Sequence, residues 1–188
     1  MTVDLRLVAA RVAKGDAEAF RQVVDLTRAP LFRLAARLVG DLGDAEDVLQ
    51  DAYVSAYKAL VGGAYDGRSK LETWLYRIVT NASVDALRRR RTRGPVVEAS
   101  NDVETDDHVR AEARVALSEL EGMLAELSAD ERAAIVLVAV EGLTTKAAAE
   151  ALNCSEGAVE QRLVRARKTL RAARGSKDGR ARATAKED

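Results

Sequence analysis

Residues 70–93 (KLETWLYRIVTNASVDALRRRRTR) bring together side chains that can hold a nucleic-acid strand. Trp74, Arg77, Asn81 and Arg88 recur at spacings of three, four and seven residues, so they share one side of a predicted helix. Guanidinium groups pair with phosphates, an amide hydrogen-bonds to base edges, and an aromatic ring stacks on an unpaired base. The sequence therefore predicts a nucleic-acid-binding helix. The alternative is a core helix that runs into a solvated basic segment.

An apolar stripe on the same segment predicts how this helix is held in place. Its members recur every three or four residues, which gives one face for packing against neighbouring helices. A loop at residues 61–69 (VGGAYDGRS) precedes the helix and brings Tyr65 and Arg68 close to its start. The stripe consists of Leu71, Leu75, Ile78, Val79, Ala82 and Ala86.

Another predicted helix, residues 45–60, carries an acidic face. Asp44 is its expected N-cap, because an aspartate side chain accepts hydrogen bonds from the free N–H groups of a first turn. Glu46, Asp47, Gln50 and Asp51 lie on one side, and such a face suits a partner rich in arginine. An ordinary solvated helix face is the alternative. The expected buried side is made of Val48, Leu49, Ala52, Ala56 and Leu60.

Residues 128–171 have the layout of a helix-turn-helix. Ser128 or Asp130 is expected to cap a helix that ends at Glu141-Gly142, and Thr144 or Thr145 to cap a short second helix. Asn153 can take the left-handed conformation of a turn, and Ser155 then caps a third helix. We interpret Cys154 in this turn as a packing residue, with a redox switch as the alternative.

The third helix of this layout combines a buried stripe with a polar face that fits a major groove. Short polar residues at the start of the helix and guanidinium groups further along can contact base edges and phosphates. A small helical bundle with a solvated basic helix is the alternative. The stripe is Val159, Leu163, Ala166 and Leu170; the polar face is Ser155, Glu156, Gly157, Glu160, Gln161, Arg162, Arg165 and Lys168.

The composition predicts an all-α protein. Alanine and leucine are abundant, aromatic residues make up 4% of the 188 residues, and no segment favours a sheet. The single cysteine excludes an internal disulfide, and one His beside one Cys makes no zinc site, so we expect neither a metal nor a cofactor. The charged first residues predict neither a signal peptide nor a membrane-spanning helix, which favours a cytoplasmic protein.

Charge and helix breakers divide the chain into domains. Residues 1–93 hold 16 Lys/Arg against 12 Asp/Glu, whereas residues 94–128 hold 2 against 9. Helices are expected over residues 4–39, with breaks at Gly15-Asp16 and near Pro30. We therefore predict two small helical domains, at 1–93 and 115–174, joined by a flexible acidic linker at 94–114 and followed by a disordered tail at 175–188.

Together these segments resemble an extracytoplasmic-function (ECF) sigma factor of bacterial RNA polymerase. The resemblance rests on VAKGDAEAFRQVVDLTRAPLFRLAARLVGD, DAEDVLQDAYVSAYKAL, KLETWLYRIVTNASVDALRRRR, and LSADERAAIVLVAVEGLTTKAAAEALNCSEGAVEQRLVRARKTLR, in this order. It covers residues 5–93 and 115–172 and implies a transcription initiation factor without a reaction of its own. Such a factor binds core polymerase, recognises the −10 and −35 promoter elements and promotes DNA melting.

The resemblance also implies roles for individual residues. Asp47, Gln50 and Asp51 would dock on the coiled coil of the polymerase's largest subunit, and the second domain would lie near the flap. The −35 element would be read by Ser155, Glu156, Gln161, Arg162, Arg165 and Lys168. The −10 element would be contacted by Tyr65, Arg68, Trp74, Arg77, Asn81, Arg88 and Arg89, with Trp74 equally explained as a packing residue.

Some positions depart from the family pattern. Ala148 and Ala151 replace bulkier aliphatic residues, Glu160 stands where a basic residue is common, and Val164 where histidine is common. These changes affect the expected −35 preference and not the fold. Members of the family are commonly held inactive by an anti-sigma factor, which we carry over as a hypothesis.

Two other classes of protein compete with this interpretation. A stand-alone helix-turn-helix regulator would bind DNA without polymerase, but it has no need of an acidic docking helix followed by a basic helix. An enzyme would need a nucleophile, a base or a phosphate-binding loop in a strand-to-helix context, and the sequence offers none.

Overall fold

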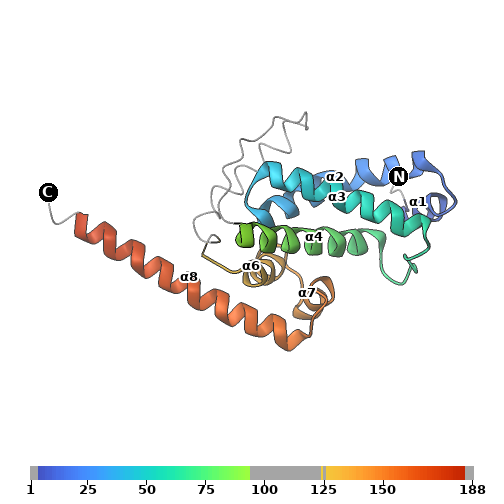
Figure 1. The fold of residues 1–188 in the computed structure, drawn as a ribbon. Coiled ribbons are helices and arrows are strands. Elements are labelled where there is room, and N and C mark those ends of the chain that lie inside the picture. Colours follow the sequence, from blue (N-terminus) through green and yellow to red (C-terminus); the bar gives the residue numbers. More distant parts are fainter. Residues whose placement is uncertain (1–3, 94–123, 125, 185–188) are drawn as a thin grey trace. The chain divides into compact units, whose positions relative to one another are not determined.

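The computed structural model describes residues 4–93, 124 and 126–184, which form helices and no strand (Figure 1). The chain divides into two compact units, Met1–Val115 and Ala116–Asp188. The expected all-α class is confirmed. The predicted acidic linker at 94–114 lies outside the described residues. Within the described residues, no helix combines the length and the apolar character needed to cross a bilayer.

The first unit contains four helices in the described residues: α1 (Leu5–Val12), α2 (Ala17–Val39), α3 (Leu42–Val61) and α4 (Leu71–Arg93). Aspartates begin three of them. Asp4 accepts a hydrogen bond from the N–H of Arg6, Asp16 from Ala19 and Asp41 from Asp44. These caps satisfy N–H groups that have no partner inside a helix. The predicted break at Gly15-Asp16 is confirmed.

The core of this unit lies where α2, α3 and α4 meet, and each of these helices contacts the other two. Phe32, Leu34 and Leu38 of α2 and Leu71 of α4 are fully buried. Leu60 of α3 is nearly so. Burial of large aliphatic and aromatic side chains contributes about 1.5–3 kcal/mol each relative to exposure. The long basic helix is therefore fixed by its apolar side.

Two predicted helix boundaries are wrong. The helix α2 continues through Pro30, because its buried residues run on both sides of the proline, at Val23 and Leu31 for example, and offset a cost of about 3 kcal/mol. The helix α3 begins at Leu42 with Asp41 as its N-cap. Asp44, the expected cap, is thus inside the first turn.

The apolar stripe predicted on α4 is only partly right. Leu71, Leu75 and Val79 are buried, but Ile78, Ala82 and Ala86 are half-buried. The buried surface of α4 is wider than one stripe because the helix contacts both α2 and α3. Its additional buried members are Trp74, Thr80, Ser83 and Val84.

The second unit contains α6 (Ala129–Ile135), the π-helical segment η1 (Val136–Val140), α7 (Thr145–Ala151) and α8 (Glu156–Thr184). Ser128 caps α6 in a capping box with Glu131, and Thr144 caps α7 through the N–H of Ala147. The predicted left-handed turn residue is confirmed, since Asn153 has φ 49°. The helices α6 and α7 both pack against α8.

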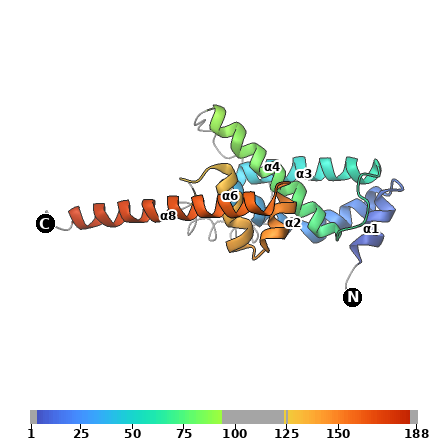
Figure 2. The ribbon, with the colours of Figure 1, turned by 90° about the horizontal axis from the view of Figure 1, so that it is seen from below.

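The last helix is longer than predicted. It extends past α6 and α7 and reaches Thr184, although a disordered tail was expected from residue 175 (Figures 1 and 2). Half of residues 175–184 are alanine, arginine or lysine, which favour helix, whereas Gly175 and Gly179 disfavour it. Residues 185–188 of the expected tail lie outside the described residues.

Candidate polymerase and nucleic-acid interfaces

An open groove of about 610 Å³ lies between α2 and α3 on the first unit. Its apolar lining comes from both helices and includes Val54, whose side chain is 47% exposed. Asp47 and Gln50, two of the predicted docking residues, line the groove, whereas Asp51 is exposed on α3 outside it. The remaining lining residues are Ala17, Phe20, Val24, Arg28, Glu46, Leu49, Tyr53, Tyr57 and Lys58.

Three aromatic rings are among the residues that line this groove. Phe20 of α2 meets Tyr53 at 6.2 Å with an interplanar angle of 87°, and Tyr57 at 5.0 Å with an angle of 65°. These edge-to-face contacts hold the two helices together. The hydroxyl of Thr27 donates to the carbonyl of Val23 at 2.7 Å, so the hydroxyl of Tyr53, at 2.8 Å, donates to Thr27.

Burial raises the pKa of Tyr53 to about 12, from an ordinary value near 10. Because the folded state holds this proton more tightly, the resulting stabilisation is complete below pH 10 and is lost as the pH rises from 10 to about 12. We expect Tyr53→Phe to lose less stability than the native chain between pH 9.5 and 11.5, measured by urea unfolding. Burial also raises the pKa of Tyr65, so Tyr65→Phe should change the pH dependence of stability in the same direction. Equal losses in native chain and Tyr53→Phe would contradict this assignment.

The acidic start of α3 is tied to the basic end of α4. The Nη1 of Arg90 lies 2.9 Å from Oδ2 of Asp44, with both side chains about half exposed. Partial burial raises the pKa of Asp44, and the charge of Arg90 opposes this effect. One arginine of the basic run therefore links α4 to the start of α3 within the first unit.

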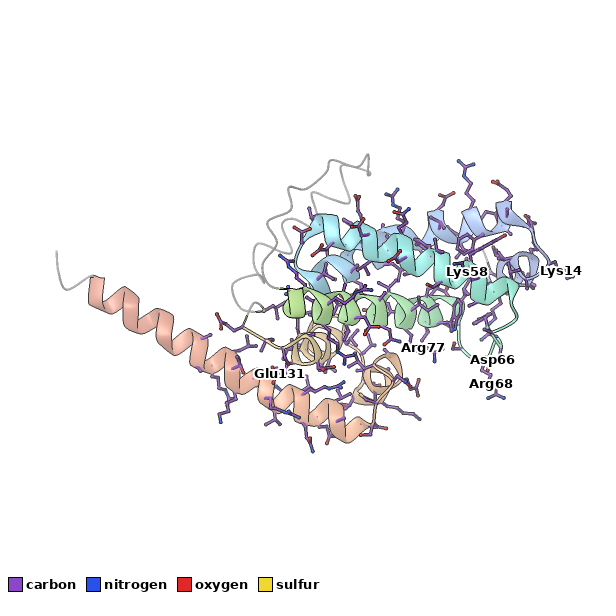
Figure 3. All side chains as sticks on the ribbon, in the orientation of Figure 1. Lys14, Lys58, Asp66, Arg68, Arg77 and Glu131 are labelled. Carbon is purple, nitrogen blue, oxygen red and sulfur yellow. The ribbon has the colours of Figure 1, made fainter. Side chains whose placement is uncertain are left out.

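The loop before α4 and the first turns of this helix hold the predicted −10 residues. Arg68 is fully exposed beside Asp66, with Nε 3.3 Å from Oδ2, and both project from the loop in Figure 3. Arg77 is exposed on α4 and Asn81 is half-buried. Arg88 lies 3.4 Å from Asp85 on the same helix. Arg89 is exposed as well. The exposed cations and the half-buried amide could contact a nucleic-acid strand that runs along α4.

Two aromatic residues of the predicted −10 set pack against each other instead of facing solvent. The rings of Tyr65 and Trp74 lie 5.1 Å apart, and Trp74 is only 7% exposed. The hydroxyl of Tyr65 donates to the carbonyl of Ser69 at 2.6 Å. Of the two explanations for Trp74, this geometry favours packing, and both rings fix the loop against the helix.

The predicted −35 residues lie on α8, and all but one are exposed. Ser155 is the N-cap, since its hydroxyl accepts a hydrogen bond from the N–H of Ala158 at 3.2 Å. Exposed polar side chains follow along the helix and leave its apolar side to the core. They are Glu156, Gln161, Arg165 and Lys168.

Arg162 is the exception, because its guanidinium is held inside the second unit. Its Nη2 lies 3.2 Å from Oδ1 of Asp130 in α6, and its Nη1 lies 3.3 Å from the sulfur of Cys154 in the turn. The side chain is 20% exposed. Arg162 thus ties α8 to α6 and to the turn, which is a different task from the predicted DNA contact.

The apolar part of the α2–α3 groove was missed by the sequence analysis. Tyr53 and Tyr57 are four residues apart, a spacing that places both rings on one side of α3. They lie outside the aliphatic stripe predicted there, and this is the signal that could have revealed the groove. The ring of Phe20, from another helix, completes the aromatic contacts, and no local pattern places that ring.

Comparisons with known proteins cover both units. The family described as Sigma-70 region 2 matches residues 23–93, and the family described as Sigma-70, region 4 matches residues 117–170. The ECF RNA polymerase sigma factor SigW of Bacillus subtilis is 30% identical, over 86% of this chain and 91% of its own length. The sigma factor SigM of Mycobacterium tuberculosis is 35% identical, over 89% and 82% respectively.

Solved structures agree with these matches. A structure of CnrH in complex with the cytosolic domain of CnrY is similar with a TM-score of 0.64 and 32% identity, covering 93% of this chain and 99% of that one. The sigma factor RpoE of Bartonella quintana, crystallised with the anti-sigma factor NepR, gives a TM-score of 0.55 and 26% identity, over 82% and 95%.

Proposed function

The chain belongs to the ECF sigma factors of the sigma-70 family, and from this premise we propose which of its surfaces meet RNA polymerase and promoter DNA. It is a DNA-binding initiation factor that works with RNA polymerase in promoter recognition. The matches to region 2 and region 4, one on each unit, carry this conclusion. Its action is assigned to the cytoplasm, where polymerase and promoters meet.

The α2–α3 groove is the proposed docking site for the coiled coil of the polymerase's largest subunit. Its apolar lining offers buried area to a partner helix, and the carboxylate of Asp47 and the amide of Gln50 at its edge offer hydrogen bonds to arginines. Asp51, exposed outside the groove, extends the same acidic surface. A contact of the second unit with the flap is part of the same proposal.

The loop at residues 62–70 and the exposed side of α4 are the proposed −10 surface. Arg77, Arg88 and Arg89 would neutralise phosphates, and Asn81 and Arg68 would contact an unstacked base. Tyr65 and Trp74 would support this surface by fixing the loop. Unstacking a base costs a few kcal/mol, which contacts of this kind offset.

The exposed side of α8 is the proposed −35 surface, inserted in the major groove of the duplex. Ser155, Glu156, Gln161, Arg165 and Lys168 would contact bases or phosphates there. Arg162 would position the helix through Asp130. The domains proposed are residues 1–93 for the −10 element and 115–174 for the −35 element.

A protein inhibitor is the proposed regulator. Both similar structures are complexes, of CnrH with the cytosolic domain of CnrY and of RpoE with the anti-sigma factor NepR. An anti-sigma factor that covers the α2–α3 groove of this chain would exclude polymerase from it. No reaction and no cofactor are proposed for either unit.

Transcription in vitro tests this function against that of a stand-alone regulator. We expect core polymerase with this chain to start RNA synthesis at promoters from which core alone does not, selected from a promoter library. The free chain should bind the same DNA weakly, because docking on core places its two units. Tight, specific binding by the free chain without any core-dependent transcription would favour the regulator instead.

A further inference from the structure

The middle of the exposed face of α8 is not polar. Val164 is 64% exposed there, whereas Val159, Leu163 and Ala166 are buried on the opposite side. It is a large apolar side chain surrounded by solvated polar ones. Single exposed apolar residues are common on protein surfaces, so the argument depends on what lies beside this one.

Gly157 lies two helical turns before Val164, on the same line of the exposed face. A Cβ added at Gly157 would meet no atom within 4 Å, and its φ is not in the left-handed region. Gly157 is the second residue of α8, and glycine is less favourable than alanine in a helix, by about 1 kcal/mol in the interior. Neither packing nor backbone conformation explains this residue, so the fold does not require it.

Polar and cationic side chains flank this line. Gln161, Arg165 and Lys168 are exposed within one or two turns of Val164 and suit a polyanion with readable edges. Glu160, also exposed on this face, can accept only from a donor such as the amino group of cytosine. The combination of cations, an amide and one apolar group matches the major-groove edge of DNA, where the 5-methyl of thymine is the apolar group.

We propose that Val164 contacts the 5-methyl group of a thymine in the −35 element, and that Gly157 leaves the room α8 needs to approach that closely. This inference rests on the assignment of α8 to the −35 duplex and adds the residue that selects a base. Valine would thereby favour an A·T pair at one position of the element, in the orientation that brings the thymine methyl to Val164.

Removal of the methyl group from DNA tests the contact directly. Holoenzyme made from core polymerase and the full chain first selects its −35 element from a library randomised in that segment. Each thymine of the selected element is then replaced in turn by deoxyuridine. We expect one replacement to weaken binding about fourfold, as for the loss of one buried methyl group. The variant Val164→Ala should bind the thymine and deoxyuridine probes equally.

Matched variants separate this contact from general effects. Val140→Ala makes the same truncation at an exposed valine of η1, and it should keep the full discrimination. Gly157→Ala should weaken binding to both probes while its melting temperature stays equal or rises. Discrimination that persists in Val164→Ala, or that is absent at every thymine, would overturn the proposal, as would full affinity of Gly157→Ala. Unchanged promoter binding of Arg165→Ala and Lys168→Ala would overturn the −35 assignment itself.

Discussion

Replacing Val54 by lysine weakens binding of the chain to core polymerase by about tenfold to a hundredfold. Val54 lines the α2–α3 groove, and a partner helix seated there would bury its side chain, which contributes about 1.5–3 kcal/mol. A lysine removes this contribution and adds a cation opposite the arginines that the acidic edge is expected to bind. The affinity is measured with labelled chain and purified core polymerase.

Val61 provides the matched control for this substitution. It lies on the same helix, is 46% exposed against 47% for Val54, and does not line the groove. Lysine is a better helix former than valine at both exposed sites, so neither variant should unfold. Equal losses of affinity for Val54→Lys and Val61→Lys would show that the docking surface is not the groove.

Only part of the α2–α3 groove could be predicted from the sequence. The acidic residues of α3 were predicted from their spacing within one helix, since i, i+3 and i+4 neighbours always share a side. The groove beside them needs Phe20 from α2 to meet Tyr53 and Tyr57 from α3. Contacts between helices depend on crossing geometry, which no local periodicity encodes. The acidic residues of the groove were therefore predictable and its apolar lining was not.

Helix boundaries followed the same division between local and tertiary causes. The caps at Asp16, Ser128 and Ser155 could be predicted because a cap depends on residues within one turn. The continuation of α2 through Pro30 could not, because burial along the whole helix outweighs the local penalty. The proline itself is exposed.

For side chains at the predicted DNA surfaces, periodicity predicted the position on the helix but not the contacts with other elements. Periodicity places Arg162 and Arg165 near one another on α8 and gives no means of distinguishing their tasks. The partner that distinguishes them, Asp130, lies on another helix and is distant in sequence. Trp74 is a similar case, because its burial depends on Tyr65 folding back from the loop. A cation or a ring on a predicted binding face is thus a candidate contact only until its neighbours are known.

The second large effect that we expect is a loss of stability in Arg162→Ala that Arg165→Ala does not show. Arg162→Ala should lower the stability of the second unit by about 1–3 kcal/mol, because it removes both the ion pair to Asp130 of α6 and the contact with Cys154 in the turn. Thermal unfolding of the full chain would show this as a drop of several degrees in the transition of that unit. Promoter binding should fall as well, as an indirect result.

Arg165→Ala should give the opposite pattern and serves as the control. Its side chain is exposed and no structural contact in the described residues is expected to fail, so the free energy of unfolding should stay within about 0.5 kcal/mol of the native value. Binding of holoenzyme to the −35 duplex should nevertheless weaken, with a smaller dependence on salt, because one phosphate or base contact is lost.

A double-mutant cycle makes the assignment of Arg162 decisive. If its main contact is Asp130, the variant carrying both Arg162→Ala and Asp130→Ala should be less destabilised than the sum of the single variants, because either single substitution already removes the whole pair interaction. Additive losses would indicate that the ion pair is worth little and that Arg162 acts elsewhere. A native melting temperature of Arg162→Ala together with lost −35 binding would restore this arginine to the DNA surface, and α8 would then be positioned by its apolar stripe alone.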